Sequence, residues 1–359
     1  MQTKKSILFC PLDWGIGHAS RSIPVIRYLN DNGHRVMIAA DGKPLKLLQA
    51  NFPKNDFITF PGYVPTYSEK NTLILKMIAE SPKIFRSIYT EQSFVENQVR
   101  KFQIDGVISD NRFGSYSMKV PSVFISHQLN IQTPGFLNFT KPLIKYLNFN
   151  YINKFSEVWI PDFEHEPSLS GDLSHGSKTN IQMHYIGPLS RFEQRNTVEE
   201  KEIDLLVILS GPEPQRSIFE NKIIKLLAQK TIKTIIIRGL PGEESLPNCP
   251  SHIQIMNHLA QDELQTIIEK SKTIVARAGY STIMDLFILK QNAILIPTPG
   301  QTEQEYLAKH LNKNKWFVFI SQKDFEIDML ENIQFEGFKN RQIVSNGFED
   351  RLQTWVSQI

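Results

Sequence analysis

Cysteine is nearly absent from this chain, which contains only Cys10 and Cys249 among its 359 residues. Two cysteines so far apart fit neither a disulfide framework nor a zinc site of the usual spacing. Because stable disulfides belong to oxidising compartments, we expect a cytoplasmic protein.

Long apolar runs and a strong charge imbalance are also missing. No uninterrupted apolar segment reaches the length that spans a bilayer. The first apolar run stops at Pro11 and Asp13, which indicates a first strand and not a signal peptide. The formal net charge is only +3, so nucleic acid is not an expected partner. The length suits two domains of ordinary size.

The range from Ile274 to Ala308 has the clearest pattern. Two short apolar runs, the second from Ala293 to Ile296, alternate with helical patterns, and a turn with Gly279 follows the first run. This order of strand, turn, helix, strand, loop and helix is typical of a parallel α/β sheet. Ser281 and Thr282 stand where the N-cap of the first helix is expected.

A second motif opens the chain. The apolar run from Ser6 to Cys10 leads into Gly15-Ile16-Gly17-His18-Ala19-Ser20-Arg21 and then into a helical pattern. A glycine-rich turn between a strand and a helix lets a ligand approach the backbone. No third glycine follows at dinucleotide spacing, which argues against a nicotinamide enzyme. A histidine at the start of a helix is by itself more often structural than catalytic.

Together these motifs resemble those of the GT-B glycosyltransferases. The similarity is to the family 28 peptidoglycan GlcNAc-transferase type and to the UDP-glycosyltransferase type. It implies an α/β protein of two Rossmann-like parallel-sheet domains that face a cleft. We place an acceptor-binding domain at 1–190, a nucleotide-sugar-binding domain at 191–345 and a C-terminal helix that returns to the first domain at 346–359. The polar segment from Gly187 to Lys201 is the expected linker.

The resemblance assigns donor binding to the second half. Gly279 would lie beside the diphosphate, Asp285 would hold the ribose hydroxyls, and Glu303 with Gln304 would bind the donor sugar. Arg216 would neutralise phosphate, although a solvated cation on a helix face is an equally good interpretation. The residues expected to bind the donor are Ser210, Gly211, Arg216, His258, Arg277, Gly279, Ser281, Thr282, Asp285, Glu303 and Gln304.

The resemblance assigns the chemistry to the first half. His18 would be the general base, and Asp110, at the end of the apolar run 105–110, would orient its imidazole. A structural Asp110 that caps the next turn is the alternative. The residues expected to line the acceptor cleft are Gly15, Gly17, Arg21, His127 and Gln128.

The implied reaction is hexosyl transfer from a UDP-sugar to an acceptor hydroxyl, with inversion. No Asp-x-Asp motif is present, which fits a mechanism without a metal ion, and no cofactor is implied beyond the UDP-sugar co-substrate. The acceptor would be a small molecule, a lipid-linked molecule or a glycan. Two alternatives stay open: a hydrolase of nucleotide sugars with the same fold, and a non-catalytic protein that binds a nucleotide or a partner.

Two segments exceed the minimal α/β pattern. Tyr63 to Phe102 contains two apolar helical faces that are broken around Pro82, and such insertions build acceptor sites in GT-B enzymes. Phe136 to Phe155 combines aromatic and aliphatic residues with lysines. This second segment predicts either a helix that faces the core or a weak peripheral association with the cytoplasmic membrane surface.

Overall fold

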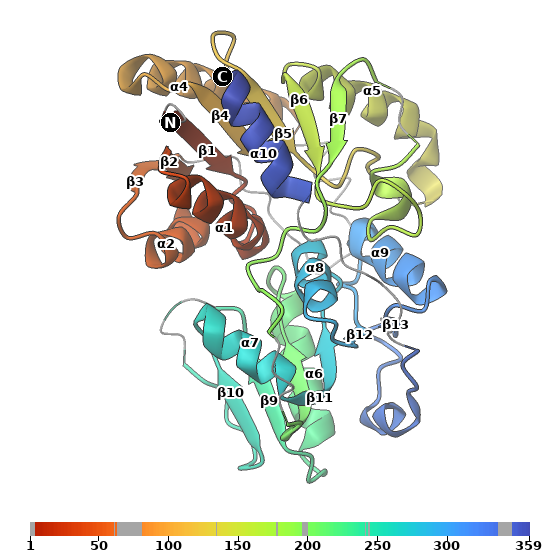
Figure 1. The fold of residues 1–359 in the computed structure, drawn as a ribbon. Coiled ribbons are helices and arrows are strands. Elements are labelled where there is room, and N and C mark those ends of the chain that lie inside the picture. Colours follow the sequence, from red (N-terminus) through yellow and green to blue (C-terminus); the bar gives the residue numbers. More distant parts are fainter. Residues whose placement is uncertain are drawn as a thin grey trace. The chain divides into compact units, whose positions relative to one another are not determined.

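The computed structural model describes residues 4–60, 62, 81–133, 135–176, 179–195, 200–240, 242, 245–336 and 347–359. The chain forms two compact units (Figure 1). The first unit extends to Ser190 and also takes in the C-terminal helix, and the second begins at Arg191. Each unit is a parallel sheet with helices packed on it.

The first unit contains a seven-stranded sheet with the order β3-β2-β1-β4-β5-β6-β7. All neighbours run parallel, and the order reverses between β1 and β4, the point at which open α/β sheets bind ligands. The strands are β1 (Ser6–Pro11), β2 (Arg35–Ala40), β3 (Asp56–Thr59), β4 (Gly106–Asp110), β5 (Ser122–Ile125), β6 (Glu157–Ile160) and β7 (Gln182–Tyr185).

Helices cover the first sheet. Helix α4 packs Val95 and Val99 against Leu8 and Cys10, which share one face of β1 because side chains alternate along a strand. Helix α1 ends at Asp31, and Gly33, the residue after its C-cap Asn32, has a φ of +77°, a conformation that glycine adopts without strain. The helices are α1 (Ile16–Asp31), α2 (Gly42–Asn51), α4 (Ser81–Phe102), α5 (Lys141–Ile152) and α10 (Gly347–Gln358), with the 3₁₀ turns η1 (Gly135–Thr140) and η2 (Gly171–Leu173).

Helix α10 joins the C-terminal end of the chain to the first unit (Figure 1). Its Trp355 is fully buried and meets Trp159 of β6 edge to face, with ring centroids 5.8 Å apart. A Cβ at Gly106 of β4 would lie 2.6 Å from the Trp355 ring, so only glycine admits the indole there.

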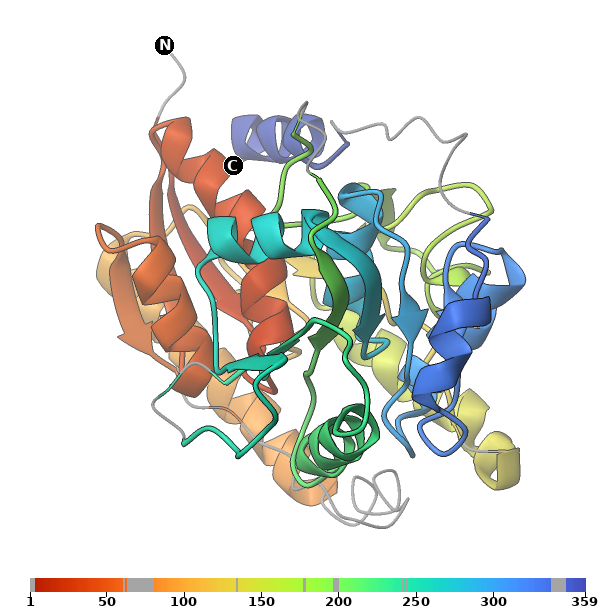
Figure 2. The same ribbon diagram turned by 90° about the horizontal axis from the view of Figure 1, so that it is seen from below.

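The second unit contains a six-stranded parallel sheet with the order β10-β9-β8-β11-β12-β13. Helices α6 and α7 lie on opposite faces of this sheet (Figure 2). Phe219, Ile223 and Leu227 of α6 pack against the apolar strands in one buried cluster. The elements are β8 (Ile203–Ile208), α6 (Gln215–Leu227), β9 (Thr234–Ile237), β10 (Ile253–Met256), α7 (Gln261–Glu269), β11 (Ser271–Ala276), α8 (Tyr280–Ile288), β12 (Ile294–Leu295), α9 (Thr302–Lys313), β13 (Val318–Phe319) and η3 (Ile327–Asn332).

The predicted N-cap of α8 is wrong. The helix begins at Tyr280 with Gly279 as its N-cap, and no side-chain capping bond is formed. Gly279 has the extended φ and ψ of a capping residue, −73° and 135°, which places Ser281 and Thr282 inside the first turn.

The predicted insertion is described only in part. Residues 63–80, which include the first predicted helical face, lie outside the described residues. Helix α4 starts at Ser81, so Pro82 stands in its first turn, where proline is tolerated. Phe85 and Tyr89 of the second predicted face are exposed, and the helix is anchored further along, at Val95 and Val99.

Candidate active site

The first-unit motif places His18 beside Asp110. Pro11, the last residue of β1, is the register partner of Asp110, the last residue of β4, so the two strands end together. Helix α1 begins five residues after Pro11 and brings His18 back over this edge. The Nδ1 atom of His18 lies 3.1 Å from Oδ1 of Asp110. The predicted contact is therefore present, and its catalytic role stays a prediction.

Arg21 joins this pair, one turn along α1 from His18. Its Nε donates to both oxygens of Asp110 at 3.0 and 2.8 Å, and its Nη2 also contacts Oδ1. Its Nη1 lies 3.1 Å from Nδ1 of His127, which follows β5. Arg21 is only 2% exposed, so little of its side chain is accessible to an acceptor, and its predicted contact with one stays a prediction. Sequence reasoning missed the pairing, although the i, i+3 spacing of His18 and Arg21 places both side chains on one helix face.

The Asp110 carboxyl is strongly acidic for a buried group. Burial by itself raises its pKa, but the charge of Arg21 and then that of His18, with hydrogen bonds from both, lower the pKa to about 2. Asp110 is thus an anion throughout the neutral range, as a partner that orients a histidine must be.

The other residues predicted at the acceptor cleft surround this edge. Gly15 is the N-cap of α1, and Gly17 lies in its first turn. His127 is buried, and the backbone N–H of Gln128 donates to the hydroxyl of Ser126 at 3.1 Å. These residues lie at the carboxyl end of the sheet, and their contact with an acceptor stays a prediction.

Glycine and arginine shape the start of α6 in the second unit. Gly211 follows β8 with a φ of +98°, and a Cβ there would lie 3.4 Å from the Thr298 hydroxyl. Ser210 precedes it, half-buried. Arg216 is buried and donates to Glu213 at 2.6 Å and to Glu220 at 3.1 Å. The alternative of a solvated Arg216 is therefore wrong, because carboxylates compensate its charge inside the fold, and its role toward phosphate stays a prediction.

Arg277 holds three loop ends together. Its guanidinium donates to the carbonyl oxygens of Ile296 and Pro297, both at 3.3 Å, and to that of Gln215 at 2.9 Å. The side chain is fully buried and stacks on Phe219, 4.3 Å from its ring centroid. Burial lowers its pKa to about 9. These three hydrogen bonds go to the backbone, so a contact with the donor stays a prediction.

Arg191 interacts electrostatically with two predicted donor residues. Its Nε lies 3.5 Å from Oδ2 of the buried Asp285. Burial, and then the charge of Arg191, lower the pKa of His258. Arg191 lies in the segment that the sequence predicts as a linker, so nothing in its local pattern marked it as part of a site.

The loop before α9 contains the predicted sugar contacts. The Oε1 atom of Gln304 accepts from the Thr298 backbone N–H at 2.9 Å, and its Nε2 donates to Gln301. This amide therefore supports its own loop. Glu303 lies in the first turn of α9, as Ser281 and Thr282 do in α8. Their contacts with a donor stay predictions.

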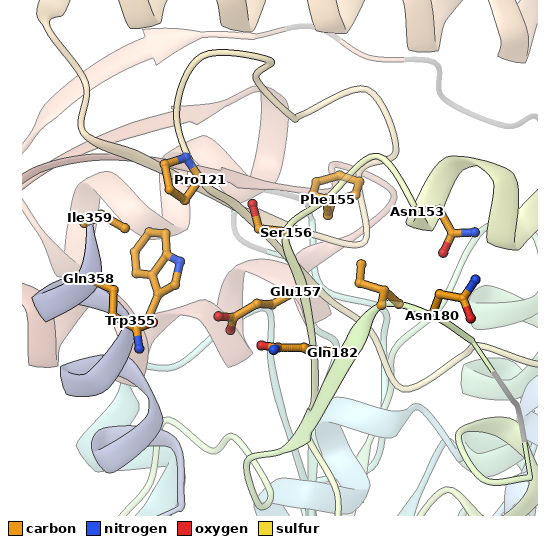
Figure 3. A pocket seen from close by; sticks show the side chains of 11 residues that line it. Pro121, Asn153, Phe155, Ser156, Glu157, Asn180, Gln182, Trp355, Gln358 and Ile359 are labelled. Carbon is orange, nitrogen blue, oxygen red and sulfur yellow. The ribbon is translucent and has the colours of Figure 1, made fainter.

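A pocket of about 680 Å³ lies away from all these residues (Figure 3). It opens at the amino ends of β6 and β7, beside α10, where Ser156, Gln182 and Trp355 line it. Catalytic side chains in parallel sheets lie at the opposite, carboxyl edge. None of the predicted site residues lines this pocket.

Within the described ranges of the chain, no helix is both long and apolar enough to cross a membrane. No cluster of three or more histidine, cysteine, aspartate or glutamate side chains in those residues could hold a metal ion.

The chain is similar to known proteins along most of its length. The model of the glycosyltransferase family 28 C-terminal domain matches residues 221–344. An uncharacterized glycosyltransferase of Methanosarcina acetivorans is 22% identical over 305 residues, which cover 81% of this chain and 79% of the relative. A UDP-N-acetylglucosamine--N-acetylmuramyl-(pentapeptide) pyrophosphoryl-undecaprenol N-acetylglucosamine transferase of Vesicomyosocius okutanii is 34% identical over 90 residues, 24% of this chain and 26% of the relative.

Solved structures share the fold. UGT89C1 of Arabidopsis thaliana, complexed with UDP-L-rhamnose, superposes with a TM-score of 0.62 at 12% identity and covers 99% of each chain. The predicted fold, two Rossmann-like parallel-sheet domains of the GT-B type, is confirmed.

Proposed function

We infer that this chain, which resembles the GT-B glycosyltransferases of family 28 and of the UDP-glycosyltransferase type, is a glycosyltransferase that moves a sugar from a UDP-sugar to an acceptor hydroxyl. The observation that carries the proposal is the contact between His18 and Asp110 at the carboxyl edge of the first sheet. It supplies a base at the place where GT-B enzymes activate acceptors. A small molecule, a lipid-linked molecule or a glycan could each supply the hydroxyl.

His18 would remove the proton from that hydroxyl. The acceptor oxygen then attacks the anomeric carbon of the donor sugar and forms the new glycosidic bond. The bond from that carbon to the UDP oxygen breaks on the opposite face, so the configuration inverts and UDP leaves with the bonding electrons. The proton stays on His18 until solvent removes it. A positioned base of this kind contributes about 10²–10⁴-fold to the rate.

The second unit would bind UDP. The N-termini of α6 and α8 present backbone N–H groups, and helix N-termini favour anions. Three buried cations contact the first half of α6: Arg216 and Arg238 donate to Glu220, and Arg277 donates to the Gln215 carbonyl oxygen, with Glu213 and Glu220 as the carboxylates beside them. This positive balance supports stabilisation of the departing diphosphate by the chain itself, and we propose a mechanism without a metal ion.

The transfer is tested by measuring UDP release from a panel of UDP-sugars, with and without an extract that supplies acceptors. We expect release that depends on the acceptor extract, and a new product whose mass is larger by one sugar residue. Rapid, stoichiometric sugar release without any acceptor would identify a hydrolase. Binding of UDP without turnover under either condition would identify a non-catalytic protein.

Donor binding predicts a thermal shift. UDP should raise the melting temperature, because a ligand that binds only the folded state stabilises it, by about 2.7 kcal/mol at one hundred times its Kd. Asp285→Ala should reduce the shift, since Asp285 is the group expected to hold the ribose. Asp262→Ala, the same change in the exposed first turn of α7, serves as the control. An unchanged melting curve at millimolar UDP and UDP-sugars would contradict the donor assignment.

Helix α5 sharpens the prediction about the membrane. One side of the helix packs on the protein, since Asn148 and Ile152 are buried. The other side is exposed, since Leu143 and Tyr146 are 60% and 68% exposed. The helix therefore faces the core on one side, and Leu143 and Tyr146 belong to an outer face that is exposed. The exposed side chains and the neighbouring lysines suit a lipid-linked acceptor or an anionic membrane surface.

We therefore predict weak, salt-sensitive binding to anionic vesicles. Each lysine near such a surface contributes about 1 kcal/mol. Leu143→Ser should reduce co-sedimentation with vesicles at low salt. Leu246→Ser, which removes a comparably exposed leucine of the second unit, should leave it unchanged. Equal recovery of protein in the supernatant with and without vesicles would exclude the membrane role.

A further inference from the structure

Asp110 serves two cationic or proton-bearing partners at once. Its carboxylate accepts from Nε of Arg21 at 3.0 and 2.8 Å and lies 3.1 Å from Nδ1 of His18. Arg21 and Asp110 are 2% and 1% exposed, so water screens their interaction little. The proposed base His18 and its partner Asp110 therefore form a triad with the buried Arg21.

The arginine determines the tautomer of His127. A guanidinium can only donate hydrogen bonds. Since Nη1 of Arg21 lies 3.1 Å from Nδ1 of His127, that nitrogen has to accept. The ring proton of His127 is therefore on Nε2.

His18 needs the opposite tautomer. Its Nδ1 lies 3.1 Å from Oδ1 of Asp110 and 3.0 Å from Nη2 of Arg21, and one nitrogen cannot donate to the first and accept from the second. A carboxylate only accepts, and a bare nitrogen facing it would be repelled. Nη2 of Arg21 donates one of its two protons to Asp110, so its nearness to Nδ1 of His18 does not require that nitrogen to accept. The proton of neutral His18 is therefore on Nδ1, and its Nε2 is free of a proton.

We propose that Arg21 is a positioning residue with two tasks: it holds His18 and His127 in opposite tautomers, and it neutralises the carboxylate of Asp110 beside the proposed base. An unshared carboxylate beside His18 would favour the imidazolium, which cannot accept a proton. With Arg21 present, the pair still orients the ring but carries no net charge. This extends the proposed function, which rests on His18 and Asp110, to Arg21.

Other charged groups near α1 are engaged elsewhere. Arg112 pairs with Glu91 at 3.0 Å, and Asp13 accepts from the Gly62 backbone N–H at 3.2 Å. Asp41 caps α2. Burial, and then the charges of Glu349 and Asp350 on α10, raise the pKa of Tyr28, which lies roughly three turns along α1 from His18. On α2, Lys43 and Lys46 are exposed. The local charge at His18 is thus set by Arg21 and Asp110.

Histidine-ring NMR tests the tautomers directly. In protein with ¹⁵N-labelled histidine, two-bond proton–nitrogen spectra show which ring nitrogen carries the proton, and His18→Gln and His127→Gln assign the signals. We expect the proton on Nδ1 in His18 and on Nε2 in His127. A neutral His18 with its proton on Nε2 would overturn the proposal. The spectra need no substrate, so a failure of the glycosyltransferase function would not affect this result.

Titration of the same signals tests the charge. In Arg21→Met, the midpoint of the His18 titration should rise by about 1–3 pH units, as expected when an opposite charge lies unshared beside a titrating group. In Asp110→Asn, which leaves Arg21 without its anion, the midpoint should fall. Arg21→Lys keeps the charge and should stay near the wild-type midpoint. Arg35→Met, which removes an exposed cation of the same unit, serves as the control.

Melting curves accompany each variant, because Arg21 is buried. If Arg21→Met does not fold, the other two variants decide the question: the midpoint of the His18 titration should fall in Asp110→Asn and stay near that of the wild type in Arg21→Lys. Midpoints that stay unchanged in Asp110→Asn and in the folded arginine variants would show that Arg21 acts only in packing and would overturn the proposal.

Discussion

His18→Ala should lower turnover with a UDP-sugar and an acceptor by about 10²–10⁴-fold, the usual contribution of a positioned base. The affinity for UDP should hardly change, because the residues expected to bind the donor belong to the second unit. Turnover is measured as UDP release, and affinity by calorimetry. His165→Ala, which removes an exposed histidine of the first unit, should keep full activity.

Asp110→Asn should lose less than His18→Ala, since it disturbs the orientation of the base without removing it. The double variant should be scarcely worse than His18→Ala alone, because groups that act as one unit lose activity non-additively. Full activity in His18→Ala would remove the histidine from the mechanism. Losses that multiply in the double variant would keep both residues but contradict their coupling.

Trp355→Ala should lower the free energy of unfolding by about 3–5 kcal/mol, the usual cost of removing a buried tryptophan side chain. The indole is 1% exposed, stacks edge to face on Trp159 and fills the space above Gly106. Its loss should free α10 from the sheet and increase amide exchange in that helix. Denaturant unfolding and hydrogen exchange measure the two effects.

Phe139→Ala is the control for that experiment. Phe139 is also a large aromatic residue of the first unit, but it is 78% exposed. Its replacement should change stability by no more than about 0.5 kcal/mol, as surface substitutions usually do. If both variants were equally stable, α10 would not be packed through Trp355.

Many strands could be predicted from the sequence because they are short, continuous apolar runs between turn residues. The apolar runs from Ser6 to Cys10 and over 105–110 agree with β1 (Ser6–Pro11) and β4 (Gly106–Asp110) to within one residue at each end. Strands that are buried on both faces read in this way, and the alternation of such runs with helical patterns indicated two parallel sheets.

Helix ends were less certain, because capping depends on the dihedral angles of a single residue. Ser281 and Thr282 are good capping residues, yet the turn after β11 makes Gly279 the cap. Similarly, the apolar pattern of α5 did not reveal that Leu143 and Tyr146 face outward. Which side of such a helix meets the core depends on what the rest of the chain places there.

The sequence by itself determined where the strands lie along the chain and the two motifs that follow them, because apolar periodicity and turn chemistry act over a few residues. It also placed His18 and Asp110 at strand ends of one edge. Only the tertiary structure decided which partners the buried arginines contact. Arg21 binds Asp110, Arg277 binds three backbone carbonyl oxygens, and Arg191 lies beside Asp285. An arginine side chain reaches partners that are distant in sequence, and its choice among them depends on burial and on the geometry of nearby acceptors.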